Sequence, residues 1–218
     1  MARKSVVATT LIAVALIYAV FRYNIVRGVP WEQLPLYITN KGIALSAVLL
    51  IALSYVIGPL TRFSPKTFSP WLTTRKYFGL LGFGLAAIHG IISLLIFDPS
   101  YYPRFFGENG KLDFNGELSM LFGVISIIIF SVVSISSLNT IEKTIEKKEW
   151  LKIQRMGYLA FILVMLHVVF MGYRGWLQPQ DWPGGLLPIS LISFIFIVLT
   201  LLLRTIVIVF PNNSSPKH

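Results

Sequence analysis

Six long apolar segments are the feature that most constrains this chain. A transmembrane helix needs roughly 20 mainly apolar residues, and six segments reach about that length. Their approximate bounds are 5–21, 42–60, 77–97, 117–138, 154–173 and 186–210. Because short loops separate them, the sequence predicts an all-α membrane protein in which six transmembrane helices form one bundle.

The composition leaves little room for another kind of domain. Of the 218 residues, 55% are hydrophobic and 13% are charged, whereas about 25% are charged in an average soluble domain. No stretch outside the apolar segments approaches the ~50 residues of a small folded domain. We therefore expect residues 1–218 to form a single transmembrane domain, and any nucleotide-binding module to come from another protein. The sequence contains no cysteine, which excludes disulfides, thiolate metal sites and cysteine nucleophiles.

The net charge of +10 is explained better by membrane topology than by a nucleic-acid partner. Lys and Arg gather at the ends of the apolar segments, and basic residues favour the inner side of a membrane. An inside N-terminus places 13 of the 19 Lys and Arg residues inside and 6 outside. The sequence therefore predicts that both the N- and C-termini lie inside.

Two of the three histidines fall within apolar segments. His218 ends a polar tail and is interpreted as incidental, but His89 and His167 lie at membrane depth, where an ionisable side chain usually marks a functional site. His89 follows Arg75 by 14 residues and His167 follows Arg155 by 12. At the helical rise, both imidazoles lie ~18–21 Å above the inner basic border. Because both helices begin inside and run parallel, the two rings are expected at the same depth.

A histidine pair at one depth favours a haem held by two axial ligands. Haem iron needs two protein ligands, whereas zinc sites use three or four. Gly82 lies on the helical face of His89 and would leave space for a flat ligand. Arg174, with Tyr173 and Arg104, is a candidate partner for the haem propionates. The alternative is a non-redox scaffold or transporter in which the histidines and glycines only pack helices together.

Three stretches carry a resemblance to a known family, and they read ITNKGIALSAVLLIALSYVIGPLTRF, TRKYFGLLGFGLAAIH and WLKIQRMGYLAFILVMLH. Over about residues 38–205, the chain resembles the ferric reductase-like transmembrane domain superfamily, and within it the haem-binding membrane subunits called MsrQ or YedZ. In this superfamily two helices commonly carry an outer and an inner histidine pair. His89 and His167 match the outer pair, whereas Arg75 and Gln154 stand at the inner positions. The resemblance therefore implies one haem b, in a multi-pass protein of the cell (inner) membrane.

The resemblance also implies a function in electron transfer. It implies a cytochrome b subunit of an oxidoreductase system, which takes electrons from quinol or a separate flavoprotein reductase and passes them to an outer-face acceptor. The implied acceptor is an MsrP-like methionine sulfoxide reductase catalytic subunit, and the alternative is a ferric or other metal reductase component. Quinone or FMN stays open as a further ligand.

Overall fold

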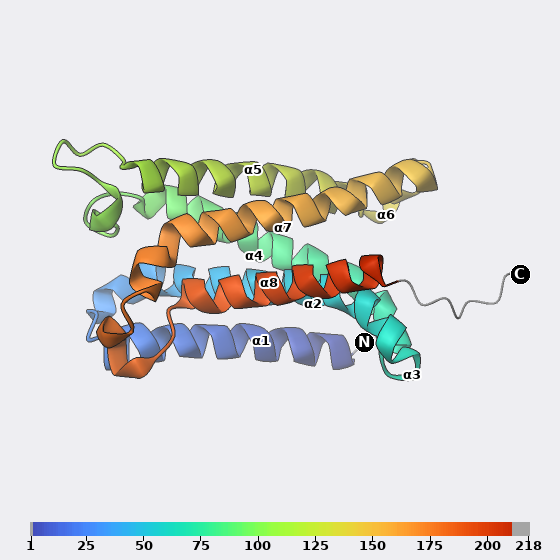
Figure 1. The fold of residues 1–218 in the computed structure, drawn as a ribbon, viewed down its shortest axis with the longest axis horizontal. Coiled ribbons are helices and arrows are strands. Elements are labelled where there is room, and N and C mark those ends of the chain that lie inside the picture. Colours follow the sequence, from blue (N-terminus) through green and yellow to red (C-terminus); the bar gives the residue numbers. More distant parts are fainter. Residues whose placement is uncertain (1, 211–218) are drawn as a thin grey trace, which may run out of the picture.

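The computed structural model describes residues 2–210, and six long helices dominate it (Figure 1). These helices are α1 (Ala2–Val20), α2 (Thr39–Phe63), α4 (Arg75–Ile96), α5 (Phe114–Ser136), α7 (Lys147–Trp176) and α8 (Ile189–Val209). All six belong to helical segments long and apolar enough to cross a membrane. Residues 2–210 contain no β-strand, only an isolated bridge between Phe106 and Leu112. The predicted all-α, six-span fold class is confirmed.

Short helical turns connect the long helices. They are η1 (Phe21–Val26), η2 (Trp31–Gln33), η3 (Leu34–Ile38), α3 (Pro65–Phe68), η4 (Ser69–Thr74), η5 (Pro103–Phe105), α6 (Asn139–Glu142), η6 (Pro179–Asp181) and η7 (Pro183–Gly185). Two of them, η1 and η3, are π-helical turns, the first directly after the C-terminal end of α1 and the second directly before the N-terminal end of α2. Within the charged stretch 141–150, α6 ends at Glu142 and α7 begins at Lys147.

The long helices form a ring with one helix outside it. α2 packs against α1, α4 and α8, while α5 packs against α4 and α7, and α7 packs against α8. α2, α4, α5, α7 and α8 therefore close a ring, and α1 lies against the outside of α2 (Figure 1). The most extensive contacts join α2 with α4 and α5 with α7. The ring thus consists of two closely packed helix pairs, with α8 bridging them.

Small residues allow the close approach of helices to α2. A Cβ atom at Gly42 would lie 2.7 Å from Leu16 Cδ2 on α1. A Cβ atom at Gly82 on α4 would lie 3.1 Å from the backbone nitrogen of Ile51 and 3.2 Å from the carbonyl oxygen of Ala47. Glycine at a helix crossing lets two backbones come together in a membrane bundle. These two positions therefore fix how closely α1 and α4 sit on α2.

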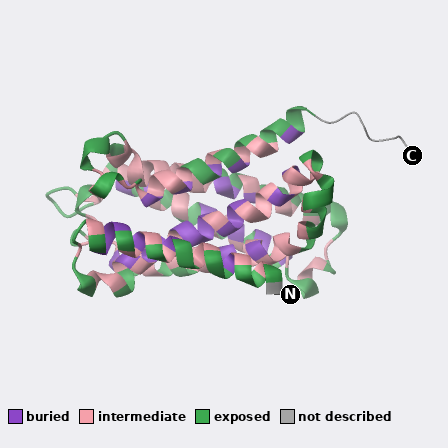
Figure 2. Ribbon diagram, turned by 90° about the horizontal axis from the view of Figure 1, so that it is seen from below, coloured by how far each residue is buried: buried purple, intermediate pink, exposed green. Residues whose placement is uncertain are grey.

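Burial follows the expected pattern of a membrane protein. Buried residues run through the middle of the bundle, and exposed residues cover its outer helix faces and its end loops (Figure 2). Large exposed apolar side chains occur on all six long helices, for example Ile17, Leu95 and Leu199. An apolar outer surface is suited to lipid, since the helices already satisfy their own backbone hydrogen bonds.

The lack of native cysteine makes the predicted orientation directly testable. Lys111 lies in the loop between α4 and α5, and Lys148 lies at the start of α7, at the other end of the bundle. With both termini inside, Lys111→Cys should react with a membrane-impermeant maleimide in intact cells. Lys148→Cys should react only after the membrane is permeabilised. The opposite labelling pattern would show that the orientation drawn from the Lys and Arg distribution is wrong.

Candidate functional site

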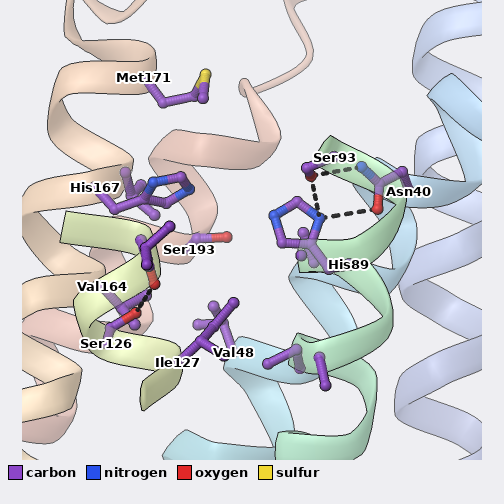
Figure 3. A pocket seen from close by; sticks show the side chains of 18 of the residues that line it. Asn40, Val48, His89, Ser93, Ser126, Ile127, Val164, His167, Met171 and Ser193 are labelled. Atoms are coloured by element: carbon purple, nitrogen blue, oxygen red, sulfur yellow. Dashed lines mark hydrogen bonds between the residues drawn. The ribbon is translucent and has the colours of Figure 1, made fainter. Parts of the chain in front are cut away.

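A cavity of about 510 Å³ lies inside the ring, between the two helix pairs. Its volume falls within the range of about 300–1,000 Å³ that is typical of small-molecule and cofactor sites. The walls are mostly apolar and include Val48, Ile51, Ala86, Ile127, Phe130, Phe161, Val164 and Met171. His89 on α4 and His167 on α7 also line the cavity, on opposite sides of it (Figure 3). The structure thus brings the two sequence-predicted histidines together.

The separation of the two imidazoles suits two ligands of one metal ion. The ring centres of His89 and His167 lie 6.5 Å apart, and the ring planes are inclined at 73°. A metal–imidazole bond is about 2 Å long and the nitrogen lies about 1 Å from the ring centre, so opposed imidazoles have centres about 6 Å apart. Each ring can rotate about its metal–nitrogen bond, so the observed inclination is compatible with such ligation.

A buried amide fixes the protonation of His89. The Asn40 side chain, on α2, is only 1% exposed, and its Oδ1 lies 2.9 Å from Nδ1 of His89. Asn40 Nδ2 donates a hydrogen bond to Ser93 Oγ at 2.9 Å, which orients the amide (Figure 3). Because an amide oxygen only accepts, Nδ1 of His89 must carry the proton. A neutral ring then has its lone pair on Nε2, where a metal can bind.

A backbone carbonyl fixes the protonation of His167 in the same way. Nδ1 of His167 donates to the carbonyl oxygen of Ser119 on α5, at 2.8 Å, and the Ser119 hydroxyl donates to the carbonyl oxygen of His167 at 3.2 Å. Gly123, one turn along α5, leaves room for the ring: a Cβ atom there would lie 2.9 Å from Nδ1. Histidine ligands of metals commonly donate their other ring nitrogen in this way. Both imidazoles are therefore held with Nε2 unprotonated.

In the part of the chain that the structure describes, no third histidine or carboxylate joins the pair in a group that could hold a metal ion. The site therefore offers two nitrogen ligands and an apolar chamber. This donor set fits a cofactor that brings its own equatorial ligands, such as haem.

Two other residues expected at the site lie elsewhere. Gly82 does not line the cavity, because its face of α4 is pressed against Ile51 and Ala47 of α2. Arg174 lies outside the cavity as well: its side chain is 58% exposed, and Nη1 is 3.8 Å from Asp113 Oδ2. Gly82 thus packs against α2 and Arg174 forms a surface ion pair, and their contacts with a cofactor stay a prediction.

The sequence did not predict three polar residues of the site, namely Asn40, Lys41 and Ser119. Asn40 and Lys41 line the cavity from the first turn of α2, and Ser119 is fully buried behind His167. The available signal was the polar pair Asn40-Lys41 at the start of an otherwise apolar segment. Lys41 was counted toward membrane topology, and nothing in the sequence indicates that its side chain turns inward.

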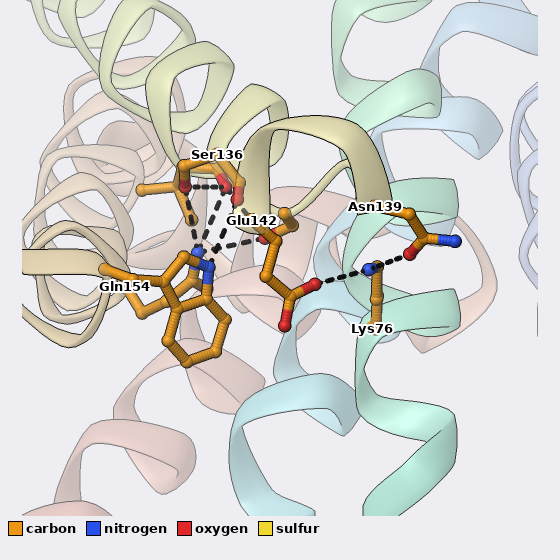
Figure 4. Close-up of polar contacts among 8 residues, drawn as sticks. Lys76, Ser136, Asn139, Glu142 and Gln154 are labelled. Atoms are coloured by element: carbon orange, nitrogen blue, oxygen red, sulfur yellow. Dashed lines mark hydrogen bonds and ion pairs between the residues drawn. The ribbon is translucent and has the colours of Figure 1, made fainter. Parts of the chain in front are cut away.

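Arg75 and Gln154, which the sequence resemblance sets at the inner positions, make contacts between helices. Arg75 Nε donates to the carbonyl oxygen of Ser54 at 2.9 Å, and Ser54 Oγ donates to the carbonyl oxygen of Arg75 at 2.8 Å. Gln154 Nε2 lies 3.0 Å from Ser136 Oγ and 2.9 Å from Ser137 Oγ (Figure 4). Each side chain thus ties its helix to a different neighbour, α4 to α2 and α7 to α5.

Comparison with known proteins gives one family and several distant relatives. The family described as "Ferric reductase like transmembrane component" matches residues 41–165, a range that includes His89 and ends two residues before His167. The chain is 25% identical over 201 residues to Metalloreductase STEAP2 of Mus musculus and of Homo sapiens, and 23% identical over 200 residues to Metalloreductase STEAP3 of Rattus norvegicus. Each alignment covers 75% of this chain and 41% of the relative.

The chain therefore spans about 41% of the length of these relatives. The finer resemblance to MsrQ stays a prediction. Because the family match extends over more than half of the sequence, from the start of α2 into α7, this chain belongs to the ferric reductase like transmembrane component family.

Proposed function

We propose that this chain binds one haem b and passes electrons through the membrane bundle to an acceptor at its outer face. The observation that carries the proposal is the geometry of His89 and His167, with ring centres 6.5 Å apart and each Nδ1 donating to an oxygen acceptor. Haem supplies one-electron redox chemistry when it is bound. The residues of this chain would supply two nitrogen ligands, hold both imidazoles in orientation and line the chamber with apolar side chains.

A single haem per chain fits the contacts made elsewhere in the bundle. Arg75 and Gln154 stand where an inner pair of ligands would be expected from the sequence resemblance, and both are held in hydrogen bonds to neighbouring helices. Neither an arginine nor a glutamine side chain is a usual axial ligand of haem iron. We therefore infer that the chamber between His89 and His167 is the haem site.

The favoured acceptor is a metal ion, such as ferric iron. The similar proteins of known activity are named metalloreductases, and this chain shares a family with ferric reductase components. An MsrP-like methionine sulfoxide reductase subunit is the second candidate, supported by the sequence resemblance to MsrQ. Both acceptors make the chain an electron-transfer component, and both distinguish it from a non-redox scaffold or transporter.

The shape of the chamber supports an electron donor that dissolves in lipid. Ile91 and Leu94 of α4 and Val124 and Ile128 of α5 line the cavity, and all four are also exposed on the outside of the bundle. The chamber thus extends toward the lipid-facing surface between these two helices. A quinol could approach along this seam, whereas a flavoprotein reductase would have to act from the inner face.

The haem proposal is tested by purification from haem-replete cells. The protein should carry one haem b per chain with a low-spin absorption spectrum, because two neutral imidazoles are strong axial ligands. His89→Ala and His167→Ala should each lose that spectrum, while His218→Ala should keep it. A colourless wild-type protein, or a preparation with two haems per chain, would contradict the proposal.

A second test uses two glycines that differ in their surroundings. Gly123→Ala adds a methyl group 2.9 Å from His167 Nδ1, whereas a Cβ atom at Gly84 has no neighbour within 4 Å. Overpacking of this kind typically costs about 1–3 kcal/mol, and a penalty of that size on the ligating position of His167 would lower haem affinity roughly 5- to 150-fold. Haem titration of the apo protein should detect this loss for Gly123→Ala, with Gly84→Ala as the control. Equal affinities of the two variants would mean that Gly123 does not position the ligand.

Anaerobic kinetics can distinguish between the two candidate electron acceptors. Wild-type protein whose haem has been reduced chemically should be reoxidised on mixing with a ferric chelate, and the haem absorbance reports the rate. His167→Ala should show no such signal. Reoxidation by an MsrP-type subunit with methionine sulfoxide, together with no reaction toward ferric or cupric chelates, would favour the second candidate.

A further inference from the structure

A cation lies at the outer end of the chamber. Lys41, in the first turn of α2, lines the cavity directly after Asn40, the residue that holds His89. Among the described residues that line the cavity, Lys41 is the only Lys or Arg, and none is Asp or Glu. With both histidines neutral, Lys41 supplies the only full charge in the lining.

Three tyrosine rings surround the Lys41 ammonium. Its Nζ lies 4.1 Å from the ring centre of Tyr37, 5.2 Å from that of Tyr23 and 5.3 Å from that of Tyr102. Cation–π contacts within about 6 Å are attractive. The rings partly stabilise the ammonium and hold it in place, but they leave its positive charge uncompensated.

The tyrosines come from three irregular segments. Tyr23 is on the π-helical turn η1, Tyr37 is on the π-helical turn η3, and Tyr102 is in the loop after α4. π-helical turns are rare and occur frequently at functional sites. Three separate segments thus each place a tyrosine beside one cation that lines the cavity. This arrangement is typical of a binding site.

No carboxylate of the described chain neutralises Lys41. The ion pairs among residues 2–210 join Lys76 with Glu142, Lys152 with Glu149, and Arg174 with Asp113. Asp98 begins the loop that carries Tyr102, but its carboxylate accepts hydrogen bonds from the backbone nitrogen and the hydroxyl of Ser100. These bonds lower the pKa of Asp98 below its usual value and keep it engaged there. A charge taken out of water is costly unless it is paired. The position of Lys41 therefore favours a ligand that carries an anionic group.

We propose that Lys41 is the binding partner of a carboxylate on the cavity's ligand, namely a propionate of the proposed haem. This inference rests on the proposed function. Haem combines a large apolar ring with carboxylates on one edge, and the chamber combines apolar walls with one cation at its outer end. Lys41 thereby takes the role that the sequence suggested for Arg174.

The test compares two ligands that differ only in the carboxylates. Apo protein from haem-deficient cells is titrated in detergent with protohaem and with haem dimethyl ester, which keeps the iron and the ring but lacks both charges. Wild-type protein should bind protohaem at least about tenfold more tightly than the ester, since hydrogen bonds to charged groups are among the strongest. The ratio should fall toward one in Lys41→Met and recover in Lys41→Arg.

Matched variants and a second readout separate binding from structure. Arg174→Met and Lys111→Met, which remove cations outside the cavity, should keep the wild-type ratio. The haem reduction potential should be lower in Lys41→Met, because a nearby cation favours the reduced form, and it should be unchanged in Arg174→Met. If Lys41→Met does not fold, equal binding of the two ligands by wild-type protein would still overturn the proposal.

The outcomes distinguish failure of the proposed role of Lys41 from failure of the haem proposal itself. Equal binding of protohaem and ester by wild-type protein, both with low-spin spectra, would overturn the role of Lys41 and leave the haem site intact. An unchanged ratio in folded Lys41→Met would do the same. If wild-type protein gives a low-spin complex with neither ligand, the haem proposal itself fails.

Discussion

The architecture of the site depends on two hydrogen bonds, each of which joins two helices and orients one imidazole. His89 on α4 donates to Asn40 on α2, and His167 on α7 donates to the Ser119 carbonyl on α5. An unpaired polar group inside a membrane bundle costs several kcal/mol, so each bond is strongly favoured. The bonds that select the Nδ1-protonated form thus also stabilise the α2/α4 and α5/α7 pairs.

These two pairs face each other across the cavity, and a ligand bound by both histidines would join them. Binding to the folded state alone stabilises it in proportion to the logarithm of ligand concentration over Kd. The haem proposed for this family member would therefore add to stability as well as supply redox chemistry. Its apolar ring would replace the contacts that the opposed walls of the chamber cannot make with each other.

The sequence predicts how deep a residue lies along its helix, but it does not predict the direction in which the side chain points. Helical rise alone placed His89 and His167 at one level, and the structure brings their rings within 6.5 Å. Gly82 shares the stripe of His89, but it lies about 10 Å further down the helix, where α4 has crossed onto α2. A residue's depth follows from counting, whereas its neighbours depend on helix rotation and crossing. The π-helical turn η3 directly before α2 departs from regular α-helical hydrogen bonding, so the face on which Lys41 lies does not follow from counting along the sequence.

The division of the ring into two pairs also has a consequence for biogenesis. The chain emerges from the ribosome in order, so α1, α2 and α4, which carry Asn40 and His89, are synthesised before α5 and α7. Neither pair alone contains both imidazoles. A cofactor that needs both histidines can thus bind only after the α5/α7 pair has packed against the α2/α4 pair. Cofactor binding would therefore report that the bundle has assembled completely.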